Sequence, residues 1–427
     1  MKKVLIITYY WPPAGGPGVQ RVLKFAKYLP EFGWQPIILT VKKGEYPAYD
    51  TSLEEDVHPD CKVYKTSSWE PAKLYKKFTG MAENEAVPVA ALTEQKKNWK
   101  KKLAHWIRLN LFIPDAKIGW IPFAVKTGKK IIKREKPDLI FSSSPPPTVH
   151  LIARKLAKWS KLKWVADFRD PWTEIHYYPP DRNYLSRNLD KKLESGIISD
   201  CTAAICASSS FIDLLTKNNK DKFFTITNGY DLKINEKNRT ENGKINITYT
   251  GGLTNNRYYE KLFTDISSLI RSKPELKELL QINIIGEVDN LIRNSINDIF
   301  SELNIIHFIG YVEHSQALEF VKNSDILLLF LEKKENYTGH IPAKLFEYIT
   351  SGNYILGIGP PNGDAAGIIA QTGTGKVYSP QHDFAAIVEK LIADIKNKTE
   401  KSVNWKEIKK YSRKELTKQL AARLDAI

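Results

Sequence analysis

Apolar runs typical of buried strands alternate with helical patterns along most of the chain. In the first half the predicted strands are Val4–Tyr9, Pro36–Thr40, Leu139–Ser142, Trp164–Asp167, Thr202–Ala207 and Phe223–Thr227. The helices predicted between them are Val19–Phe32, Val149–Trp159, Leu185–Ile198 and Phe211–Lys217. Strands and helices that alternate in this way are typical of a doubly wound parallel sheet.

A second series of strands and helices begins after a polar stretch, Lys233–Lys244, whose Asn, Lys and Glu content is typical of a linker. Its predicted strands are Ile245–Tyr249, Gln281–Ile285, Ile305–Phe308, Ile326–Phe330 and Tyr354–Gly357, and its predicted helices are Tyr259–Arg271, Gln316–Asn323 and Ala343–Thr350. A chain of 427 residues also exceeds what one hydrophobic core usually holds. We therefore expect an α/β protein with two Rossmann-like doubly wound parallel-sheet domains, 1–235 and 236–400. For the C-terminal helix, 401–427, a return to the first domain is left open.

The composition is that of a folded globular protein with a strong basic bias. Hydrophobic residues make up 42% and charged residues 26%, and no apolar run is long enough to span a bilayer. Three cysteines without metal-type spacing argue against a disulfide framework and favour the cytoplasm. The net charge of +16 is compatible with nucleic acid, an anionic membrane or an acidic small-molecule substrate, and does not choose among them.

The pattern is least regular between about Tyr46 and Trp120, where one amphipathic helix, Lys96–Phe112, is predicted. Its apolar stripe consists of Trp99, Leu103, Trp106, Ile107 and Leu111, and the basic residues around the stripe are Lys96, Lys97, Lys100, Lys101 and Arg108. Such a helix could lie at the inner face of an anionic cytoplasmic membrane. The alternative, which is commoner for apolar stripes, is that it packs on its own domain.

A Gly-rich loop, Tyr9–Arg21, lies between the first strand and the first helix and contains Gly16. Glycine lets the backbone approach a ligand closely, and the N-terminus of the following helix attracts anions. The loop lacks the dinucleotide fingerprint G-x-G-x-x-G, and a turn without a ligand is the alternative. His150 follows the next such loop, Ser142–Val149, and either lies near the ligand crevice or is structural.

A charged segment, Asp167–Trp172, follows another strand of the first domain. Asp170 could receive a hydroxyl of an acceptor, and Arg169 could bind an anion or hold Asp167. An Arg–Asp pair that only shapes the loop is equally consistent with the pattern.

In the second domain, candidate residues follow a strand and begin a helix. Arg257 lies on a Gly turn, Tyr249–Arg257, and its guanidinium could hold two oxygens of a diphosphate. Lys344 and Glu347 are three residues apart and share one helix face. The carboxylate could accept both hydroxyls of a ribose while the lysine balances phosphate; a surface ion pair is the alternative.

Taken in order, these motifs resemble the family 4 retaining glycosyltransferases, which have the GT-B fold, and especially bacterial members that build cell-surface polysaccharides. The resemblance extends over nearly the whole chain and also includes Asn228–Asp231, Ile309–Val312, Ser324–Leu327 and the motif Pro342-x-Lys344-x-x-Glu347-Tyr348. It implies two domains that face each other across a cleft. The second would bind a nucleotide-sugar donor and the first a glycan or lipid-linked acceptor.

The resemblance also implies roles for single residues. Glu347 would hold the ribose, and the backbone at Tyr311 and Val312 would receive the base. Gly16 would approach the diphosphate across the cleft, and Arg257 corresponds to the family's diphosphate-binding lysine.

Two residues depart from the family pattern. Gly252 stands where most members carry an arginine, so that one diphosphate cation is missing or comes from Lys344 or Arg21. Gly339 replaces the first glutamate of the family's paired-Glu motif.

Transfer in this family needs a stabilised diphosphate leaving group, and no clustered Asp motif indicates a metal. We therefore expect no metal and no cofactor, and Asp170 is the one catalytic candidate on the acceptor side. The alternatives are a nucleotide-sugar epimerase on the same scaffold, a catalytically silent protein, and a nucleic-acid binder. No nucleic-acid-binding motif is found, so nucleic acid is not an expected partner.

Overall fold

The computed structural model describes residues 1–46, 48–69, 99–175, 178–232, 234, 243–333, 337–399 and 402–427. The chain divides into two compact units. Unit 1 consists of Met1–Asn228 together with Arg413–Ile427, and unit 2 consists of Gly229–Ser412. The division therefore lies at 228/229, whereas the expected boundary at 235/236 falls outside the described residues, as do residue 401 and the first part of the expected helix, Lys96–Asn98.

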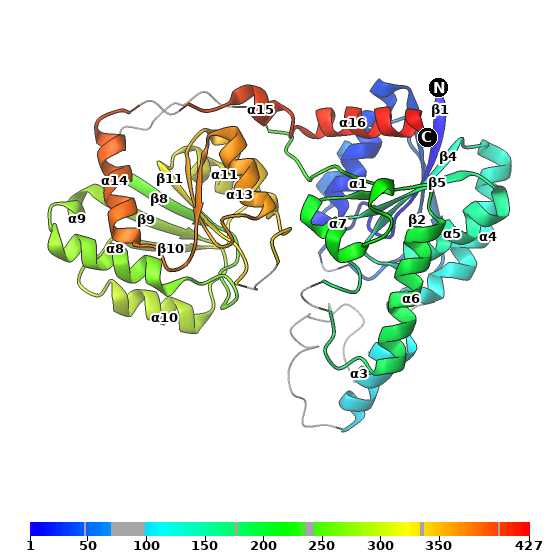
Figure 1. Ribbon diagram of the computed structural model, residues 1–427, viewed down its shortest axis with the longest axis horizontal. Helices are drawn as coiled ribbons and strands as arrows, with labels where there is room; N and C mark the ends of the chain where they lie inside the picture. Colours follow the sequence, from blue (N-terminus) through cyan, green and yellow to red (C-terminus); the bar gives the residue numbers. More distant parts are fainter. Residues whose placement is uncertain are drawn as a thin grey trace. The chain divides into compact units, whose positions relative to one another are not determined.

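Unit 1 contains a parallel sheet with the strand order β3-β2-β1-β4-β5-β6-β7 in the described residues (Figure 1). The strands are β1 Lys2–Ile7, β2 Trp34–Val41, β3 Lys62–Thr66, β4 Leu139–Ser144, β5 Lys163–Phe168, β6 Ala203–Cys206 and β7 Phe223–Thr225. The strand order reverses between β1 and β4: successive strands are added on one side as far as β3 and then on the other side from β4. These two strands pair in parallel, with Ile7 opposite Ser142. The carboxyl ends of these two strands are thus the position at which open α/β sheets bind ligands.

The helices of unit 1 cover both faces of this sheet. They are α1 Pro17–Tyr28, α3 Trp99–Leu111, α4 Ile121–Glu135, α5 Thr148–Ser160, α6 Tyr184–Asp200, α7 Ser209–Leu215 and α16 Arg413–Ala426. In α16, Leu416, Leu420 and Leu424 recur every fourth residue and join the same apolar cluster as Val19 and Leu23 of α1. The last helix of the chain therefore completes the core of the first unit.

Two elements of unit 1 were not predicted from the sequence. The strand β3 lies at the sheet edge, where its alternating residues are mostly half-buried or exposed, so its hydrophobic signal is weak. The helix α4 buries only a narrow set of residues, chiefly Ala124, Gly128 and Ile131. Segments with so little buried apolar surface resemble loops in a sequence pattern.

Unit 2 contains a second parallel sheet, with the order β10-β9-β8-β11-β12-β13 among the described residues. Its strands are β8 Ile245–Thr250, β9 Leu280–Ile285, β10 Ile306–Gly310, β11 Ile326–Phe330, β12 Tyr354–Ile358 and β13 Gly375–Tyr378. The order reverses between β8 and β11, which places a second switch point at the carboxyl ends of those strands. The prediction of two doubly wound parallel sheets is confirmed.

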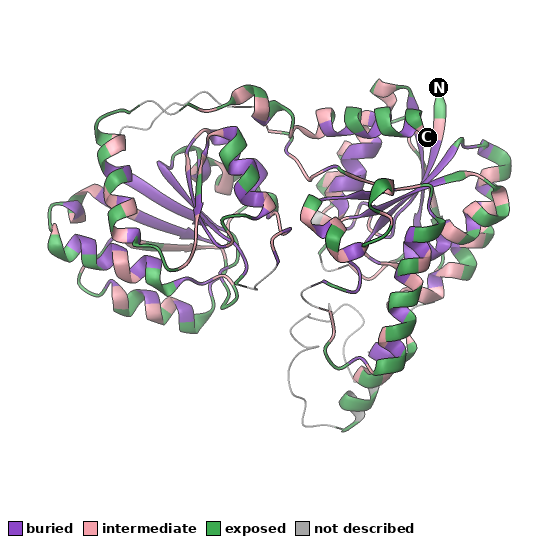
Figure 2. Cartoon of the chain, in the orientation of Figure 1, coloured by how far each residue is buried: buried purple, intermediate pink, exposed green. Residues whose placement is uncertain are grey.

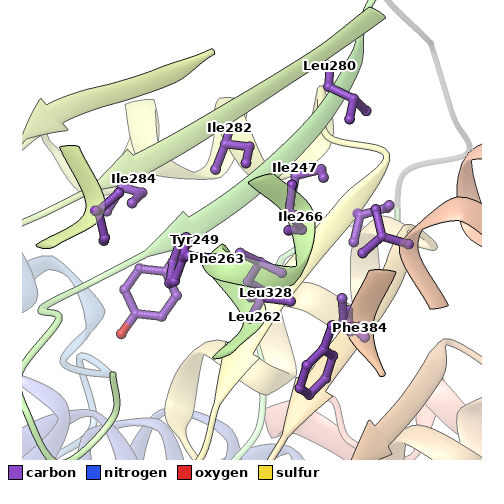
Figure 3. Packing of buried hydrophobic residues seen from close by; sticks show 14 of the residues in the cluster. Ile247, Tyr249, Leu262, Phe263, Ile266, Leu280, Ile282, Ile284, Leu328 and Phe384 are labelled. Carbon is purple, nitrogen blue, oxygen red and sulfur yellow. The ribbon is translucent and has the colours of Figure 1, made fainter. Parts of the chain in front are cut away.

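The helices of unit 2 are α8 Glu260–Ser272, α9 Leu276–Leu279, α10 Asn290–Ile299, α11 His314–Lys322, α12 Ala343–Ser351, α13 Asp364–Thr372, α14 Phe384–Lys396 and α15 Trp405–Lys409. One face of the sheet packs on α8 and α14 (Figure 3). Leu262, Phe263 and Ile266 of α8 meet Ile247 of β8 and Phe384 of α14 in this core. Burial therefore concentrates along the strands, and the outer helix faces are exposed (Figure 2). Among the described residues, no helix has both the length and the apolar composition needed to cross a bilayer.

Candidate functional site

A tight glycine turn follows β8 at the switch point of unit 2. Gly251 has a φ of +100°, and its N–H donates to the Ile285 carbonyl at 2.7 Å. Gly286, which follows β9 with a φ of +115°, lies so close that an added Cβ would come within 2.7 Å of the Gly251 carbonyl oxygen. Both positions therefore require glycine, and together they keep the backbone at this sheet edge free of side chains.

The helix α12 is fixed to the end of β8 by its first two turns. The Tyr348 hydroxyl accepts a hydrogen bond from the Thr250 N–H at 3.1 Å and lies 3.0 Å from the Thr250 hydroxyl. Burial raises the pKa of Tyr348, so the phenol stays protonated and can donate to Thr250 Oγ1. Lys344, one turn earlier, donates to the Thr250 carbonyl. The N-terminus of α12 is thereby held at the switch point.

The Lys344 ammonium occupies a confined position beneath the glycine turn. An added Cβ at Gly251 would lie 3.1 Å from Lys344 Nζ. Burial, and to a smaller extent the positive charge of Arg257, lower the pKa of Lys344 to about 7, although the Glu347 carboxylate acts in the opposite direction. An anion bound here would stabilise the charged form of Lys344, because it would offset both the burial of the ammonium and the repulsion from Arg257.

Arg257 is oriented by a carboxylate that the sequence analysis did not identify. Its Nη2 lies 3.0 Å from Oε1 of Glu332, which is 9% exposed and follows β11. The pair joins the two strands of the switch point, because Arg257 follows β8. Only its position just beyond a predicted strand could have identified Glu332 as a site residue from the sequence.

Glu347 faces the loop that follows β10. Its Oε1 lies 3.6 Å from Nε2 of His314, the first residue of α11. The preceding residues are Tyr311, which is 80% exposed, and Val312, which is half-buried. The structure thus brings Arg257, Lys344 and Glu347 to one edge of unit 2, with the Tyr311–Val312 backbone in the adjoining loop.

The two departures from the family pattern lie in different surroundings. Gly252 is exposed, and an added Cβ would meet only the Glu287 carbonyl oxygen, at 3.9 Å. An arginine side chain would therefore fit there without displacing a neighbour. Gly339 is buried.

In unit 1, Arg21 and Asp167 form a buried ion pair. Arg21 Nε and Nη2 donate to the two oxygens of Asp167 at 3.0 and 2.7 Å, and Ser143 Oγ donates to the same carboxylate at 2.6 Å. Arg21 Nη1 also donates to the Thr227 carbonyl at 2.9 Å. The pair ties α1, β4 and β5 together, so Arg21 is not a source of the missing diphosphate cation.

Arg169 is bound to backbone carbonyls at the other switch point. Its Nε donates to Ser144 at 2.8 Å and its Nη1 to Gly18 in the first turn of α1. It therefore joins the loops after β1 and β4. The hydrogen-bonded partner of Asp167 is Arg21, and the Asp167 carboxylate acts on Arg169 only through its charge. Asp170, half-buried beside Arg169, opposes the lowering of the Arg169 pKa that burial causes.

His150 lies in the core of unit 1 and does not reach the surface. Its side chain is fully buried, with Nδ1 2.8 Å from Ser142 Oγ and the ring centre 4.6 Å from that of Phe168. Burial lowers the pKa of His150 to about 3, so the imidazole is neutral. His150 is therefore a structural residue of the core, and in this conformation it cannot contact an acceptor.

Gly16 caps the N-terminus of α1 with a φ of +87°, and an added Cβ there would meet nothing within 4 Å. The backbone of the first loop is thus open toward the helix N-terminus, as a ligand-binding turn requires. The approach of Gly16 to a diphosphate stays a prediction. Within the described part of the chain, no three His, Cys, Asp or Glu side chains come together as a metal site would require.

Solved structures share the architecture of this chain. Anabaena HepE, solved in complex with UDP, aligns over 100% of both chains with a TM-score of 0.63 and 11% identity. The lipopolysaccharide outer core galactosyltransferase WaaB, in its apo form, aligns over 100% of both chains with a TM-score of 0.58 and 13% identity. A putative UDP-N-acetylglucosamine 2-epimerase from Listeria monocytogenes aligns over 100% of this chain and 96% of its own, with a TM-score of 0.52 and 11% identity. At such low identities these similarities establish the GT-B fold.

The family is established by sequence. Residues 18–234, slightly more than half of the chain, match the model of Glycosyltransferase Family 4. The chain belongs to this family and is a glycosyltransferase. No curated protein sequence matches it.

Proposed function

We propose that the protein is a retaining, metal-independent hexosyltransferase that moves a sugar from a nucleotide-diphosphate donor to a glycan or lipid-linked acceptor in cell-surface polysaccharide biosynthesis. The observation that carries this proposal is the convergence of Arg257, Lys344 and Glu347 on one switch point of unit 2. The membership of family 4 and the UDP bound by HepE support a nucleotide-sugar donor.

The site residues match the parts of such a donor. Negative charge grows on the diphosphate as the glycosidic bond breaks, and Arg257, Lys344 and the N-terminus of α12 supply positive charge at that edge. A carboxylate such as Glu347 can accept hydrogen bonds from both ribose hydroxyls, and the exposed loop at Tyr311 and Val312 offers backbone groups to the base. In this proposal Arg257 and Lys344 bind the diphosphate, and Glu347 binds the ribose.

For the transfer itself we propose attack from the face that the diphosphate leaves. The bond between the anomeric carbon and the diphosphate oxygen breaks while the acceptor oxygen bonds to the same face of that carbon. The acceptor proton passes to the departing phosphate oxygen, so that no separate protein base is needed. Asp170 remains the acceptor-side candidate, because it lies at the carboxyl end of β5 in unit 1.

An epimerase has the same fold, as the Listeria protein illustrates, so the fold does not discriminate between the two activities. The family match favours transfer to an acceptor. We place the enzyme in the cytoplasm at the inner face of the membrane, since its +16 charge suits both a diphosphate donor and an anionic, lipid-linked acceptor.

Binding measurements test the donor site directly. A panel of nucleoside diphosphates is screened by thermal shift, and a ligand at one hundred times its dissociation constant should stabilise the protein by about 2.7 kcal/mol. The affinities of the best nucleotide and of inorganic pyrophosphate are then compared in two variants. Arg257→Met should weaken both ligands by roughly tenfold, whereas Glu347→Gln should weaken only the nucleotide.

The control is Lys390→Met, which removes an exposed cation from α14 and should change neither affinity. If no nucleoside diphosphate binds, or if Glu347→Gln weakens pyrophosphate as much as nucleotide, the proposed site is wrong. NMR analysis of the anomeric configuration in donor and product then tests retention, and a product epimerised without an acceptor would identify an epimerase.

A further inference from the structure

Exposed apolar side chains concentrate on two helices of unit 1. In the described part of the chain, seven of the fourteen exposed large hydrophobic residues lie on α3 and on the first turns of α6. They are Trp99, Leu103, Trp106 and Leu111 of α3 and Tyr184, Leu185 and Leu189 of α6, here called the α3–α6 patch. Such a concentration marks an interaction surface, because single exposed hydrophobic residues are normally scattered.

Hydrogen bonds join the end of α3 to the start of α6, so the exposed side chains lie on two adjoining helices (Figure 1). The Asn110 side chain accepts from the Asn183 N–H at 2.7 Å, and the Asn110 carbonyl accepts from Ser186 Oγ at 3.0 Å. The buried contact of α3 is thus made by its C-terminal end, where Leu109 and Asn110 face inward.

The apolar stripe of α3 faces outward rather than toward the core of the unit. Trp99, Leu103 and Trp106 follow each other at intervals of four and three residues and therefore share one helix face. They are 67%, 46% and 48% exposed. The described residues of unit 1 therefore cover the C-terminal end of α3 but leave these three side chains of its stripe exposed.

The residues around the patch are basic. The helix α3 has no Asp or Glu in its sequence and contributes exposed Lys102 and half-buried Arg108, and α6 adds exposed Lys191 and Lys192. The acidic residues on the early turns of α6 are turned inward: Asp190 accepts from Trp172 Nε1 at 2.8 Å, and Glu194 accepts from the Thr173 hydroxyl at 2.6 Å. Lys191 has an ion pair with Glu174 at 3.2 Å. Exposed Asp181, whose carboxylate lies 3.9 Å from Nε2 of His105 of α3, adds one negative charge, and the other exposed charges named here are mainly positive.

We infer that the α3–α6 patch binds the surface of an anionic lipid bilayer. Tryptophan, tyrosine and leucine beside lysine and arginine are the side chains that insert at a lipid headgroup region with anionic charge. A second copy of the chain is a poor occupant, because a symmetric contact would place the lysines of both patches against each other. The purpose of the contact, delivery of a lipid-linked acceptor to unit 1, rests on the proposed function.

Flotation of the full chain with vesicles tests this inference. Vesicles of phosphatidylcholine alone are compared with vesicles that also contain phosphatidylglycerol, at physiological and at raised salt. We expect the protein to float with the anionic vesicles, and to bind more weakly at raised salt. If it stays in the soluble fraction, or floats equally with both vesicle types, the inference is overturned.

Variants locate the surface. The double variant Leu103→Ser/Trp106→Ser should lower the partition coefficient roughly tenfold or more, and Leu185→Ser/Leu189→Ser should have a similar effect. Lys102→Glu should lower it about tenfold or more on anionic vesicles only. The matched controls are Leu291→Ser, an 85% exposed leucine on α10, and Lys390→Glu on α14, which should bind like the wild type.

Two further readouts separate the possible failures. Sedimentation equilibrium without lipid should show the same mass for wild type and patch variants; a dimer that the variants abolish would assign the patch to a second copy and overturn the inference. Nucleotide affinity is measured in the same samples and should be unchanged by the patch variants. Loss of vesicle binding in a patch variant that still binds nucleotide would show that the patch binds the vesicle. Absence of nucleotide binding in the wild type would contradict the proposed function and leave the membrane inference unaffected.

Discussion

The Lys344 ammonium nitrogen lies 4.0 Å from the centre of the Tyr249 ring, so the first turn of α12 packs directly on the last residues of β8. The ring shields the ammonium from water and leaves it a short distance from the backbone of the glycine turn. The sequence alone is also compatible with a surface ion pair between Lys344 and Glu347. The burial of Lys344 against Tyr249 explains why its pKa is lowered instead. Because the pKa of Lys344 is close to neutral, the binding of an anionic ligand should depend on whether Lys344 is protonated.

The pH dependence of nucleotide binding should report on Lys344. Its pKa in the folded protein is about 7, so the ammonium is present below that pH and is lost as the pH rises through it. A diphosphate interacts with the ammonium, so we expect affinity to fall above about pH 7. Isothermal titration calorimetry in buffers of different ionisation enthalpy should detect proton uptake on binding near that pH.

The matched variant for this prediction is Lys344→Met, which retains the apolar stem but carries no charge. Its affinity should be lower than that of the wild type at acidic pH and should not change around neutral pH. A wild-type pH profile that persists in the variant would assign the titration to another group.

Restoring a cation at the glycine turn should strengthen donor binding. Gly252 has space for a side chain and does not have the positive φ of its neighbour Gly251. In Gly252→Arg, the guanidinium could reach the same diphosphate as Arg257, and the affinity for the nucleotide should rise by about tenfold. The uncharged variant Gly252→Gln is the control. Equal affinities in the two variants, measured by calorimetry at low and at high salt, would contradict this account.

Removal of one partner of the buried pair in unit 1 should be costly. In Asp167→Ala the Arg21 guanidinium would stay buried without its carboxylate, and unfolding free energy should fall by about 3–5 kcal/mol. Urea unfolding followed by circular dichroism measures the loss. The pair of exposed Lys261 with half-buried Asp265 on α8 provides the comparison, because Lys261→Ala should cost less than about 1 kcal/mol. A loss that small in Asp167→Ala would show that α1 and β5 do not depend on the pair.

Glu194 should make stability depend on pH. Burial raises the pKa of Glu194 from 4.5 to about 7, even though Thr173 donates two hydrogen bonds to the carboxylate. The folded state thus retains a proton that the unfolded state has lost, and the associated stability is fully present below about 4.5 and lost as the pH rises through about 7.

Glu194→Gln keeps the shape of the side chain without the titration. Across this pH range, the stability of the wild type relative to the variant should fall by roughly 3 kcal/mol. Chemical denaturation of both proteins at a series of pH values measures the difference. A difference independent of pH would show that the carboxyl group titrates normally.

Much of the fold could be predicted because alternating buried strands and amphipathic helices leave a strong local pattern. The strand predicted at Ile326–Phe330 is found with the same bounds, and the expected helix Leu185–Ile198 is α6 with a few more residues at its ends. The edge strand β3 was missed because only one of its five residues, Thr66, is buried. The expected single C-terminal helix is two helices, one in each unit, because α16 finds its apolar partners in α1 at the opposite end of the chain.

The sequence by itself determined two parallel α/β units and placed Arg257, Lys344 and Glu347 at strand and helix ends, since these properties depend on local periodicity and on the common edge of parallel strands. The tertiary structure alone decided their partners. Asp167 bonds to Arg21, which is 146 residues away, Glu332 orients Arg257, and the stripe of α3 is exposed. Contacts between distant segments depend on how elements pack in three dimensions, and a linear pattern does not record which face of a helix another element covers.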